Sequence, residues 1–139
     1  NYIAVNRDRV GLNDGNKIAT DPDARMALAE AVCTVDECQT IMLRNFDALV
    51  AAARAGASLS VDERIKMRFD AALVSRKCTD AINQLFIACG AQGIFRDHPL
   101  NRAWLDINAG RTHVANNPFK FGRNLGGTMM GGENQDFFL

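Results

Sequence analysis

The stretch DPDARMALAEAVCTVDECQTIMLRNFDALVAAARAG, residues 21–56, decides the fold of this chain. Thr20 or Asp21 suits the N-cap position, and Pro22 and Asp23 suit the first turn of a helix. "RAGAS" then ends the stretch with a glycine, as helices commonly end. Apolar residues recur between these signals at helical spacing: Leu28, Val32, Val35, Met42, Phe46, Leu49 and Ala53. The pattern predicts an amphipathic helix over residues 24–57, longer than the globular average of about 12 residues.

Two further helices follow. Ser60 and Glu63 form an S-x-x-E capping box, and Gly90 is the expected stop, so a second helix pairs with the first as a hairpin. The third helix begins at Pro99 and runs to about Asn117, because Pro118 disfavours helical geometry in the residue before it. The apolar rows of the second helix are Ile65, Phe69, Ala72, Val74, Cys78, Ala81, Leu85 and Ala88.

The two ends of the chain differ from this helical centre. Residues 1–20 are interpreted as the end of a truncated helix and a linker, in which Gly11 and Gly15 flank Asn13 and Asp14. The chain opens on Asn1 rather than Met, so we expect it to be the C-terminal part of a longer protein. Residues 118–139 form a glycine-rich tail, expected to lack a regular element and to be flexible or docked on a partner. Residues 21–117 are therefore the domain proper, an all-α, up-and-down helical bundle.

The composition excludes several classes of function. Lys plus Arg and Asp plus Glu balance at 16 each, which gives no electrostatic reason to expect nucleic acid or an anionic membrane as partner. No apolar run reaches the about 18 residues of a membrane span, and no signal peptide opens the chain. The four cysteines contain no C-x-x-C pair, so we expect buried free thiols, no metal site and a cytoplasmic protein. They are Cys33, Cys38, Cys78 and Cys89.

The third helix carries the stretch DINAGRTHVANN, residues 106–117. Its expected core face is Leu100, Ala103, Trp104, Ile107 and Val114. Beside that face, a polar row with a gap of small residues is expected, made of Arg102, Asp106, Ala109, His113 and Asn117. Since a glycine inside a helix costs about 1 kcal/mol relative to alanine, Gly110 indicates that another helix or a flat ligand approaches the backbone closely.

The residues alone leave two interpretations of His113. It is either a half-buried histidine bonded to a neighbouring helix or a group that handles a proton beside the gap. Asp106 lies about 10 Å away along a helix, too far to form a dyad with it. His98 is interpreted as a cap before Pro99. Arg68 and Arg76 are interpreted as solvated or inter-subunit charges.

The stretch LFIACGAQGIFRDHPLNRAWLDINAGRTHVANNP, residues 85–118, together with DPDARMALAEA, resembles the C-terminal helical domain of the acyl-CoA dehydrogenase fold. The combination R-x-W-x-D-x-x-A-G-R-x-H-x-x-N resembles one branch in particular, the two-component flavin-dependent monooxygenases that hydroxylate aromatic substrates. The resemblance implies that His113 is catalytic and that Trp104 and Asp106 line the substrate pocket. It implies flavin contacts from Ala109, Gly110, Arg111 and Asn117.

The same resemblance implies the chemistry. A separate reductase supplies reduced FMN or FAD, oxygen adds at C4a to give a hydroperoxide, and the distal oxygen passes to a phenolic ring. His113 would take the phenol proton or hold the peroxide oxygen. The family also implies a homotetramer with the C-terminal helices at its centre and the tail at a neighbouring subunit's flavin site. The fragment by itself is expected to be inactive.

Two alternatives stay open at this point. Acyl-CoA dehydrogenases commonly carry their glutamate base just before a glycine, where this chain has Ala109, so a dehydrogenase here would need a base from elsewhere. A non-catalytic helical oligomerisation domain is the other alternative, and it predicts no flavin binding by the longer protein.

Overall fold

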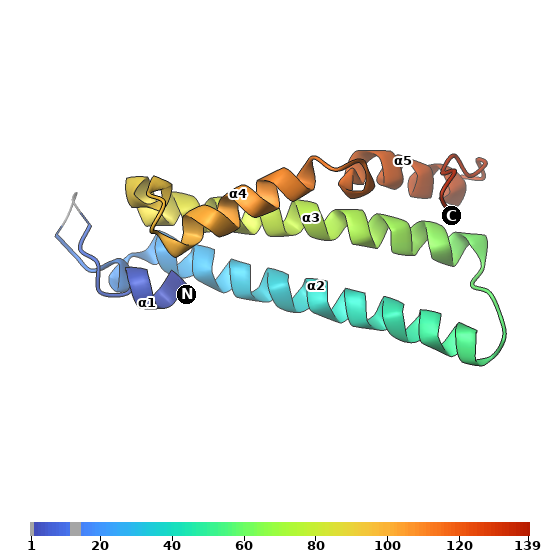
Figure 1. Ribbon diagram of the computed structural model, residues 1–139, viewed down its shortest axis with the longest axis horizontal. Coiled ribbons are helices and arrows are strands. Elements are labelled where there is room, and N and C mark those ends of the chain that lie inside the picture. Colours follow the sequence, from blue (N-terminus) through green and yellow to red (C-terminus); the bar gives the residue numbers. More distant parts are fainter. Residues whose placement is uncertain (1, 12–14) are drawn as a thin grey trace. The chain divides into compact units, whose positions relative to one another are not determined.

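The computed structural model describes residues 2–11 and 15–139 and is all-α, which confirms the expected fold class. Within these residues the only strand-like pairing is an isolated antiparallel bridge between Val10 and Lys17. Asn1, Asn13 and Asp14, on which part of the expectation for the chain's beginning rested, lie outside the described residues. The α-helices are α1 (Tyr2–Asn6), α2 (Pro22–Arg54), α3 (Val61–Cys89), α4 (Pro99–Arg111) and α5 (Pro118–Met129), joined in part by the short 3-10 helices η1 (Ile18–Thr20), η2 (Gly90–Ile94) and η3 (Val114–Asn116) (Figure 1).

The capping signals of the sequence place the ends of α2 and α3 correctly. Asp21 is the N-cap of α2, where its Oδ1 accepts a hydrogen bond of 2.7 Å from Ala24 N. At the start of α3, Glu63 Oε2 accepts from Ser60 N at 2.8 Å and Ser60 Oγ accepts from Glu63 N at 3.3 Å, which is the predicted capping box. Gly56 and Gly90 follow the two helices with φ of +62° and +67°, a left-handed conformation that glycine adopts without strain.

The chain forms two compact units. The first comprises the described residues up to 35 together with Lys77–Gly110, and it contains α4. Small side chains of α2 are buried in it, at Ala24, Ala27 and Ala31, together with Leu100 of α4. The N-terminal segment is held to the end of α3 by Arg9, whose Nη1 donates to Cys89 O at 2.7 Å and to Asn6 Oδ1 at 2.9 Å.

His98 is the N-cap of α4, as the sequence predicted. Its Nδ1 accepts a hydrogen bond of 3.2 Å from Leu100 N. The ring is also buried, with Nε2 at 3.3 Å from Cys89 Sγ, a contact that the sequence pattern did not indicate. Nearby, burial raises the pKa of Tyr2, Cys89 acts in the same direction, and Arg9 opposes both. This polar cluster fixes the start of α4 against the end of α3.

The second unit comprises Asp36–Arg76 and Arg111–Leu139. Its buried side chains include Ile65, Ala72 and Phe121. One carboxylate oxygen of Asp70 on α3 receives Arg44 Nη2 and Lys66 Nζ, each at 2.8 Å, which ties α3 to α2 within this unit. In Figure 1, α5 runs beside α3 in this unit. A Cβ at Gly122 of α5 would lie 2.8 Å from the Phe69 ring, so any larger residue here would require Phe69 or α5 to shift.

The expectation that residues 118–139 lack a regular element was wrong. Pro118 occupies the first turn of α5, and Asn117 Oδ1 accepts from both Phe119 N and Lys120 N at 3.1 Å. These capping contacts, with the burial of Phe121, offset the low helix propensity of the glycines inside α5. After α5 the chain turns at Gly131, whose φ is +88°.

The apolar row predicted along α2 is not buried within the single chain. Most of it is exposed to solvent in the single chain, with Phe46 54% exposed. The buried positions lie on a neighbouring face and carry small side chains, among them Ala27, Ala31 and Cys38. Cys33 is exposed too, which contradicts the expectation that all four thiols are buried.

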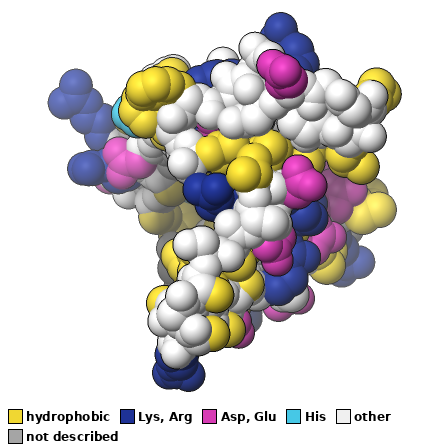
Figure 2. Space-filling view, turned by 90° about the vertical axis from the view of Figure 1, so that its right-hand side faces the viewer, with side chains coloured by type: hydrophobic (Ala, Val, Ile, Leu, Met, Phe, Trp, Pro, Cys, Tyr) yellow, Lys and Arg dark blue, Asp and Glu magenta, His cyan; other side chains and the backbone are white. Residues whose placement is uncertain are grey.

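Hydrophobic side chains are exposed among charged ones at the end of the molecule shown in Figure 2. The exposed large side chains of α2 are Met26, Val32, Val35, Met42, Leu43, Phe46, Leu49 and Val50.

Candidate functional site

The two residues expected to line a substrate pocket lie on α4, and both have partners within their own unit. Trp104 is half-buried, its Nε1 donates to Asn83 Oδ1 at 2.7 Å, and its ring centroid lies 5.0 Å from that of Phe86. Asp106 is exposed and receives Arg102 Nε at 2.9 and 2.7 Å on its two oxygens. Trp104 therefore packs α4 on α3. Asp106 faces solvent, and its negative charge is paired with Arg102.

The expected core face of α4 is correct only in part. Leu100 is buried and Ile107 is half-buried, but Ala103 is exposed and Val114 is 68% exposed. Val114 departs from the pattern because α4 ends at Arg111, earlier than the predicted end near Asn117.

Ala109, Gly110 and Arg111, the expected flavin contacts, form the last turn of α4. Ala109 and Gly110 are exposed, and a Cβ built at Gly110 would meet no atom within 4 Å. Among the described residues, then, no helix comes within 4 Å of that Cβ position, contrary to one of the two sequence interpretations. The Cβ position of Gly110 faces open space instead.

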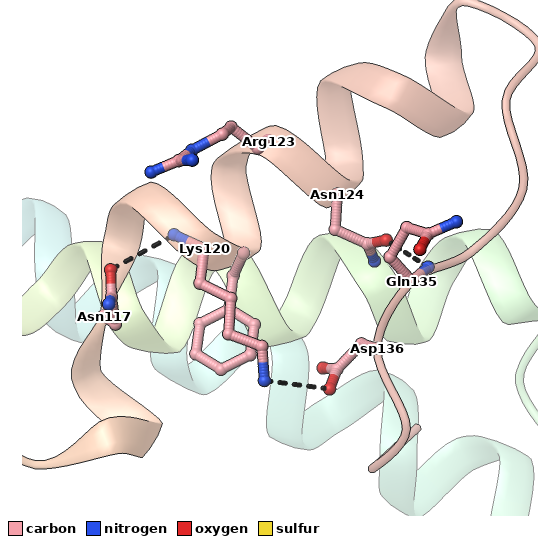
Figure 3. A pocket seen from close by; sticks show the side chains of 7 residues that line it. Asn117, Lys120, Arg123, Asn124, Gln135 and Asp136 are labelled. Atoms are coloured by element: carbon pink, nitrogen blue, oxygen red, sulfur yellow. Dashed lines mark hydrogen bonds and ion pairs between the residues drawn. The ribbon is translucent and has the colours of Figure 1, made fainter.

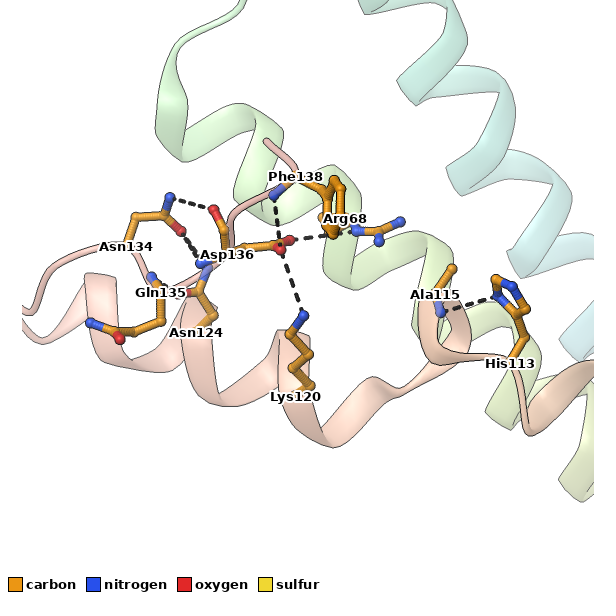
Figure 4. Close-up of polar contacts among 9 residues, drawn as sticks. All are labelled: Arg68, His113, Ala115, Lys120, Asn124, Asn134, Gln135, Asp136 and Phe138. Carbon is orange, nitrogen blue, oxygen red and sulfur yellow. Dashed lines mark hydrogen bonds and ion pairs between the residues drawn. The ribbon is translucent and has the colours of Figure 1, made fainter.

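His113 does not share a helix face with Asp106 and Ala109, because the helix has already ended. It is the N-cap of η3, and its Nδ1 accepts a hydrogen bond of 3.2 Å from Ala115 N (Figure 4). His113 is exposed, so the interpretation as a half-buried structural histidine does not hold. Asn117 likewise caps α5 rather than extending a polar row along α4.

The bond to Ala115 N has a chemical consequence for His113. A backbone N–H can only donate, so Nδ1 carries a lone pair and the neutral ring carries its proton on Nε2. This assignment follows from the hydrogen bond. Nε2 of the neutral ring can therefore donate a hydrogen bond to a partner. It can accept one only if the bond to Ala115 N breaks and the proton moves to Nδ1.

A second polar group, on α3, α5 and the C-terminal residues, was missed by the sequence analysis. Residues 131–138, called the strap below, fold back on α5, and buried Asn124 holds them. Its Oδ1 accepts from Gln135 N at 2.6 Å and its Nδ2 donates to Asn134 Oδ1 at 2.9 Å (Figure 4). Asp136 of the strap is 4% exposed and lies 3.5 Å from Arg68 Nε and 3.8 Å from Lys120 Nζ.

This group corrects the interpretation of Arg68 as a solvated or inter-subunit charge. Its guanidinium lies 4.3 Å from the centroid of the Phe121 ring and pairs with Asp136. A pocket of about 290 Å³ lies between α5 and the strap (Figure 3). In the sequence, the pocket is indicated by the helical spacing of Asn117, Lys120, Phe121 and Asn124. This signal was not used because the glycines of the tail were taken to exclude a helix. The pocket is lined by Asn117, Lys120, Phe121, Arg123, Asn124, Gln135 and Asp136.

Neither a metal-binding cluster nor a membrane-spanning helix occurs in the part of the chain that the structure describes. No group of three or more His, Cys, Asp or Glu side chains lies close enough there to hold a metal ion. No helix among residues 2–11 and 15–139 is both long and apolar enough to cross a membrane.

The element order places the described residues among all-α helical domains. Residues 1–118 match the family described as "Acyl-CoA dehydrogenase, C-terminal domain", and the chain belongs to that family. It is 32% identical over 104 residues to the oxygenase subunit HsaA of a flavin-dependent monooxygenase from Mycobacterium tuberculosis, covering 75% of this chain and 26% of that protein.

Another relative is the oxygenase component of an FADH(2)-dependent resorcinol hydroxylase from Rhizobium sp., 30% identical over 120 residues, or 84% of this chain and 29% of the relative. The chain therefore spans less than a third of these relatives. Among solved structures, XiaF from Streptomyces sp. superposes with a TM-score of 0.91 at 22% identity, covering 99% of this chain and 35% of that one. That likeness includes α5 and shows the fold.

Proposed function

We propose that this chain is the C-terminal domain of the oxygenase component of a two-component monooxygenase, which uses reduced flavin to hydroxylate an aromatic, phenolic substrate. The observation that carries the proposal is its 30 to 32% identity to two oxygenase components of flavin-dependent enzymes. Both relatives are named as parts of larger systems, so a separate flavin reductase is the proposed partner.

The last turn of α4 fits a flat cofactor. Gly110 has no neighbour within 4 Å of the place where a Cβ would stand, and Ala109 beside it is exposed and small. A planar ring can approach such a backbone closely, whereas a larger side chain would hold it away. Ala109, Gly110 and Arg111 of α4 and Asn117 at the start of α5 are the proposed contacts for reduced FMN or FAD. When bound, the flavin supplies the activation of oxygen.

His113 is the proposed catalytic residue. With Nδ1 engaged by Ala115 N, its Nε2–H is available to donate a hydrogen bond to an oxygen of the substrate or of the reacting oxygen group. This geometry favours the holding role over proton removal, the other role considered for His113. Trp104 and Asp106 are proposed to face the substrate pocket, Trp104 as a packing platform and Asp106 through its pair with Arg102.

Ala109 weighs against an acyl-CoA dehydrogenase. The residue before Gly110 has no carboxylate, and the nearby carboxylate of Asp106 is bound to Arg102 through both oxygens. A proton-abstracting base at this turn would therefore have to come from another part of the protein. Anaerobic addition of an acyl-CoA to the flavin-loaded whole protein distinguishes the two, because only a dehydrogenase bleaches its flavin in that test.

The exposed apolar face of α2 supports a homotetramer in which α2 packs against other copies of the chain. Side chains such as Phe46 and Leu43, more than half exposed in the single chain, would be buried there. The tail is then proposed to lie near a neighbouring subunit's flavin. All four cysteines, which lie among the described residues, are outside disulfides, and this supports a reducing, cytoplasmic location.

The experiment combines the whole protein with reduced flavin, oxygen and a panel of phenols. The wild type should give hydroxylated product, and His113→Ala should lower product by about tenfold or more while flavin oxidation continues with release of hydrogen peroxide. Val114→Ala, at the exposed next residue, is the matched control and should keep product formation coupled to flavin oxidation. Full coupling in His113→Ala would remove His113 from the mechanism, and no product from any phenol would oppose the proposed function.

A further inference from the structure

The pocket between α5 and the strap is lined by an excess of positive charge. Lys120 and Arg123 line it from α5, and Asp136 lines it from the strap (Figure 3). Asp136 pairs with Lys120 and with Arg68 of α3, whereas the Arg123 side chain points away from it. Two lining cations against one lining carboxylate leave a net positive charge at a cavity of about 290 Å³. A cavity of this charge and size attracts a small anion.

Asp136, the carboxylate that lines the pocket, is held incompletely. Asp136 is almost wholly buried, yet its Oδ2 and the Nε of Arg68, 3.5 Å apart, make no hydrogen bond among the described residues. Its Oδ1 accepts from Phe138 N at 3.3 Å and lies 3.8 Å from Lys120 Nζ. A buried carboxylate loses hydration, and only short charge-assisted bonds compensate that loss well. These long contacts indicate a carboxylate that another anion can replace.

The rest of the strap is attached in a way that permits release. Its first two residues bond to the backbone of α5, Gly131 N to Thr128 O at 3.0 Å and Gly132 N to Gly127 O at 2.9 Å. Beyond them, its hydrogen bonds to α5 run through Asn124, which binds Asn134 and the backbone of Gln135. Its two large apolar side chains, Phe137 and Phe138, are 90% and 74% exposed, so they add little burial that would hold it down. The ion pairs of Asp136, together with Asn124, are therefore the main restraint on the part of the strap that follows Gly132.

We propose that the α5–strap pocket is a binding site for a phosphate group, in which Asp136 is the resident counterion, and that phosphate displaces Asp136 and frees the strap. A phosphate oxygen can reach hydrogen-bond distance from Lys120 and Arg68 together, and its second negative charge matches the excess of cations. The strap thus responds to the occupancy of the pocket. The inference rests on this pocket alone and stands apart from the chemistry proposed for His113.

The test measures hydrogen exchange at the backbone amides of Gln135, Asp136 and Phe138 in the whole protein, titrated with inorganic phosphate against sodium chloride at equal ionic strength. Phosphate should speed exchange at these amides with a saturable dependence, and chloride should not. Lys120→Gln should weaken the apparent phosphate affinity by about tenfold. Arg54→Gln, a change of an exposed arginine at the end of α2, is the matched control and should leave the affinity unchanged.

Asp136→Asn provides the second variant. Without the resident carboxylate, phosphate should bind more tightly than in the wild type, whereas a merely structural Asp136 predicts no gain in affinity. Equal phosphate dependence in Lys120→Gln and Arg54→Gln, or no saturable effect of phosphate on the strap, would overturn the proposal.

The source of the phosphate group is resolved by repeating the titration with FMN and with riboflavin, which lacks the phosphate. Competition between FMN and inorganic phosphate, with none from riboflavin, assigns the pocket to a cofactor phosphate. Phosphate binding that is unchanged by saturating FMN assigns it to a free phosphate or another phosphorylated ligand. Both outcomes retain a phosphate site, and neither depends on whether the enzyme hydroxylates a phenol.

Discussion

Nε2 of His98 and Sγ of Cys89 face each other at 3.3 Å inside the first unit, both buried. Because Nδ1 of His98 accepts from Leu100 N, the neutral ring donates from Nε2 to the sulfur. The thiol in turn lies 3.3 Å from Asn6 Oδ1, to which it donates. A chain of hydrogen bonds thus runs from the first turn of α4 through the end of α3 to α1.

His98→Ala should weaken the start of α4. The substitution leaves Leu100 N without its cap and Cys89 Sγ without its hydrogen-bond donor. The free energy of local opening of α4 should therefore fall by about 1–3 kcal/mol. His98→Asn keeps a short capping side chain and should cost less. Native-state hydrogen exchange of the α4 amides measures both. His113→Ala, at an exposed cap, is the comparison and should leave α4 unchanged; an equal effect of all three variants would argue against the His98 chain.

Two glycines of α5 should respond to alanine in opposite directions. At Gly126 no atom lies within 4 Å of a new Cβ, so Gly126→Ala should stabilise α5 by about 0.5–1 kcal/mol through helix propensity. At Gly122 the new Cβ would lie 2.8 Å from the Phe69 ring, and Gly122→Ala should destabilise by about 1–3 kcal/mol. Hydrogen exchange of α5 gives both values. A stabilising Gly122→Ala would mean that Phe69 moves aside freely.

The capping box of α3 should be visible in a titration. The side-chain and backbone hydrogen bonds from Ser60 lower the pKa of Glu63 from its ordinary value. A carboxyl with a lowered pKa in the folded state contributes stability above its unfolded pKa, and that contribution is lost as pH falls through the folded pKa. Ser60→Ala should therefore raise the Glu63 pKa, as read from carboxyl NMR shifts. Ser58→Ala, just upstream, should leave it unchanged, and an unmoved pKa in Ser60→Ala would exclude the box as its cause.

The outward face of α2 should control association. Phe46→Asp places a charge on a surface that the proposed tetramer buries, so the whole protein should sediment as smaller species. Asp47→Ala changes the exposed next residue and should leave the sedimentation coefficient as in the wild type. Retention of the wild-type assembly by Phe46→Asp would place the interface elsewhere.

The helix ends could be predicted from sequence wherever a local cap determines them. Asp21, the Ser60–Glu63 box, Gly56 and Gly90 act through bonds or conformations within a few residues of themselves, and all four were placed correctly. The family could likewise be inferred from the R-x-W-x-D-x-x-A-G-R-x-H spacing, and the family match confirms it.

The predictions that were wrong concern places where a local hydrogen bond overrides the helical periodicity of the sequence, or where glycine content pointed away from a helix. Apolar and polar spacing continues past Arg111, but His113 satisfies a backbone amide of its own and ends the pattern. The prediction for α5 rested on the low helix propensity of its glycines. The cap formed by Asn117 and the burial of Phe121 stabilise the helix by more than the glycines destabilise it. Whether Ala109, Gly110, Arg111 and Asn117 contact a flavin stays a prediction.

The small buried side chains and the large exposed ones of α2 lie on different faces of a single helix. Residues such as Ala27 and Ala31 determine how closely the chain can pack on itself, while Phe46 and its outward neighbours stay exposed to solvent in the single chain. Natural variation on the outward face can therefore alter which copies recognise each other while the interior stays the same. In protein engineering, substitutions on the outward face of α2 are therefore the way to change which copies of the chain associate.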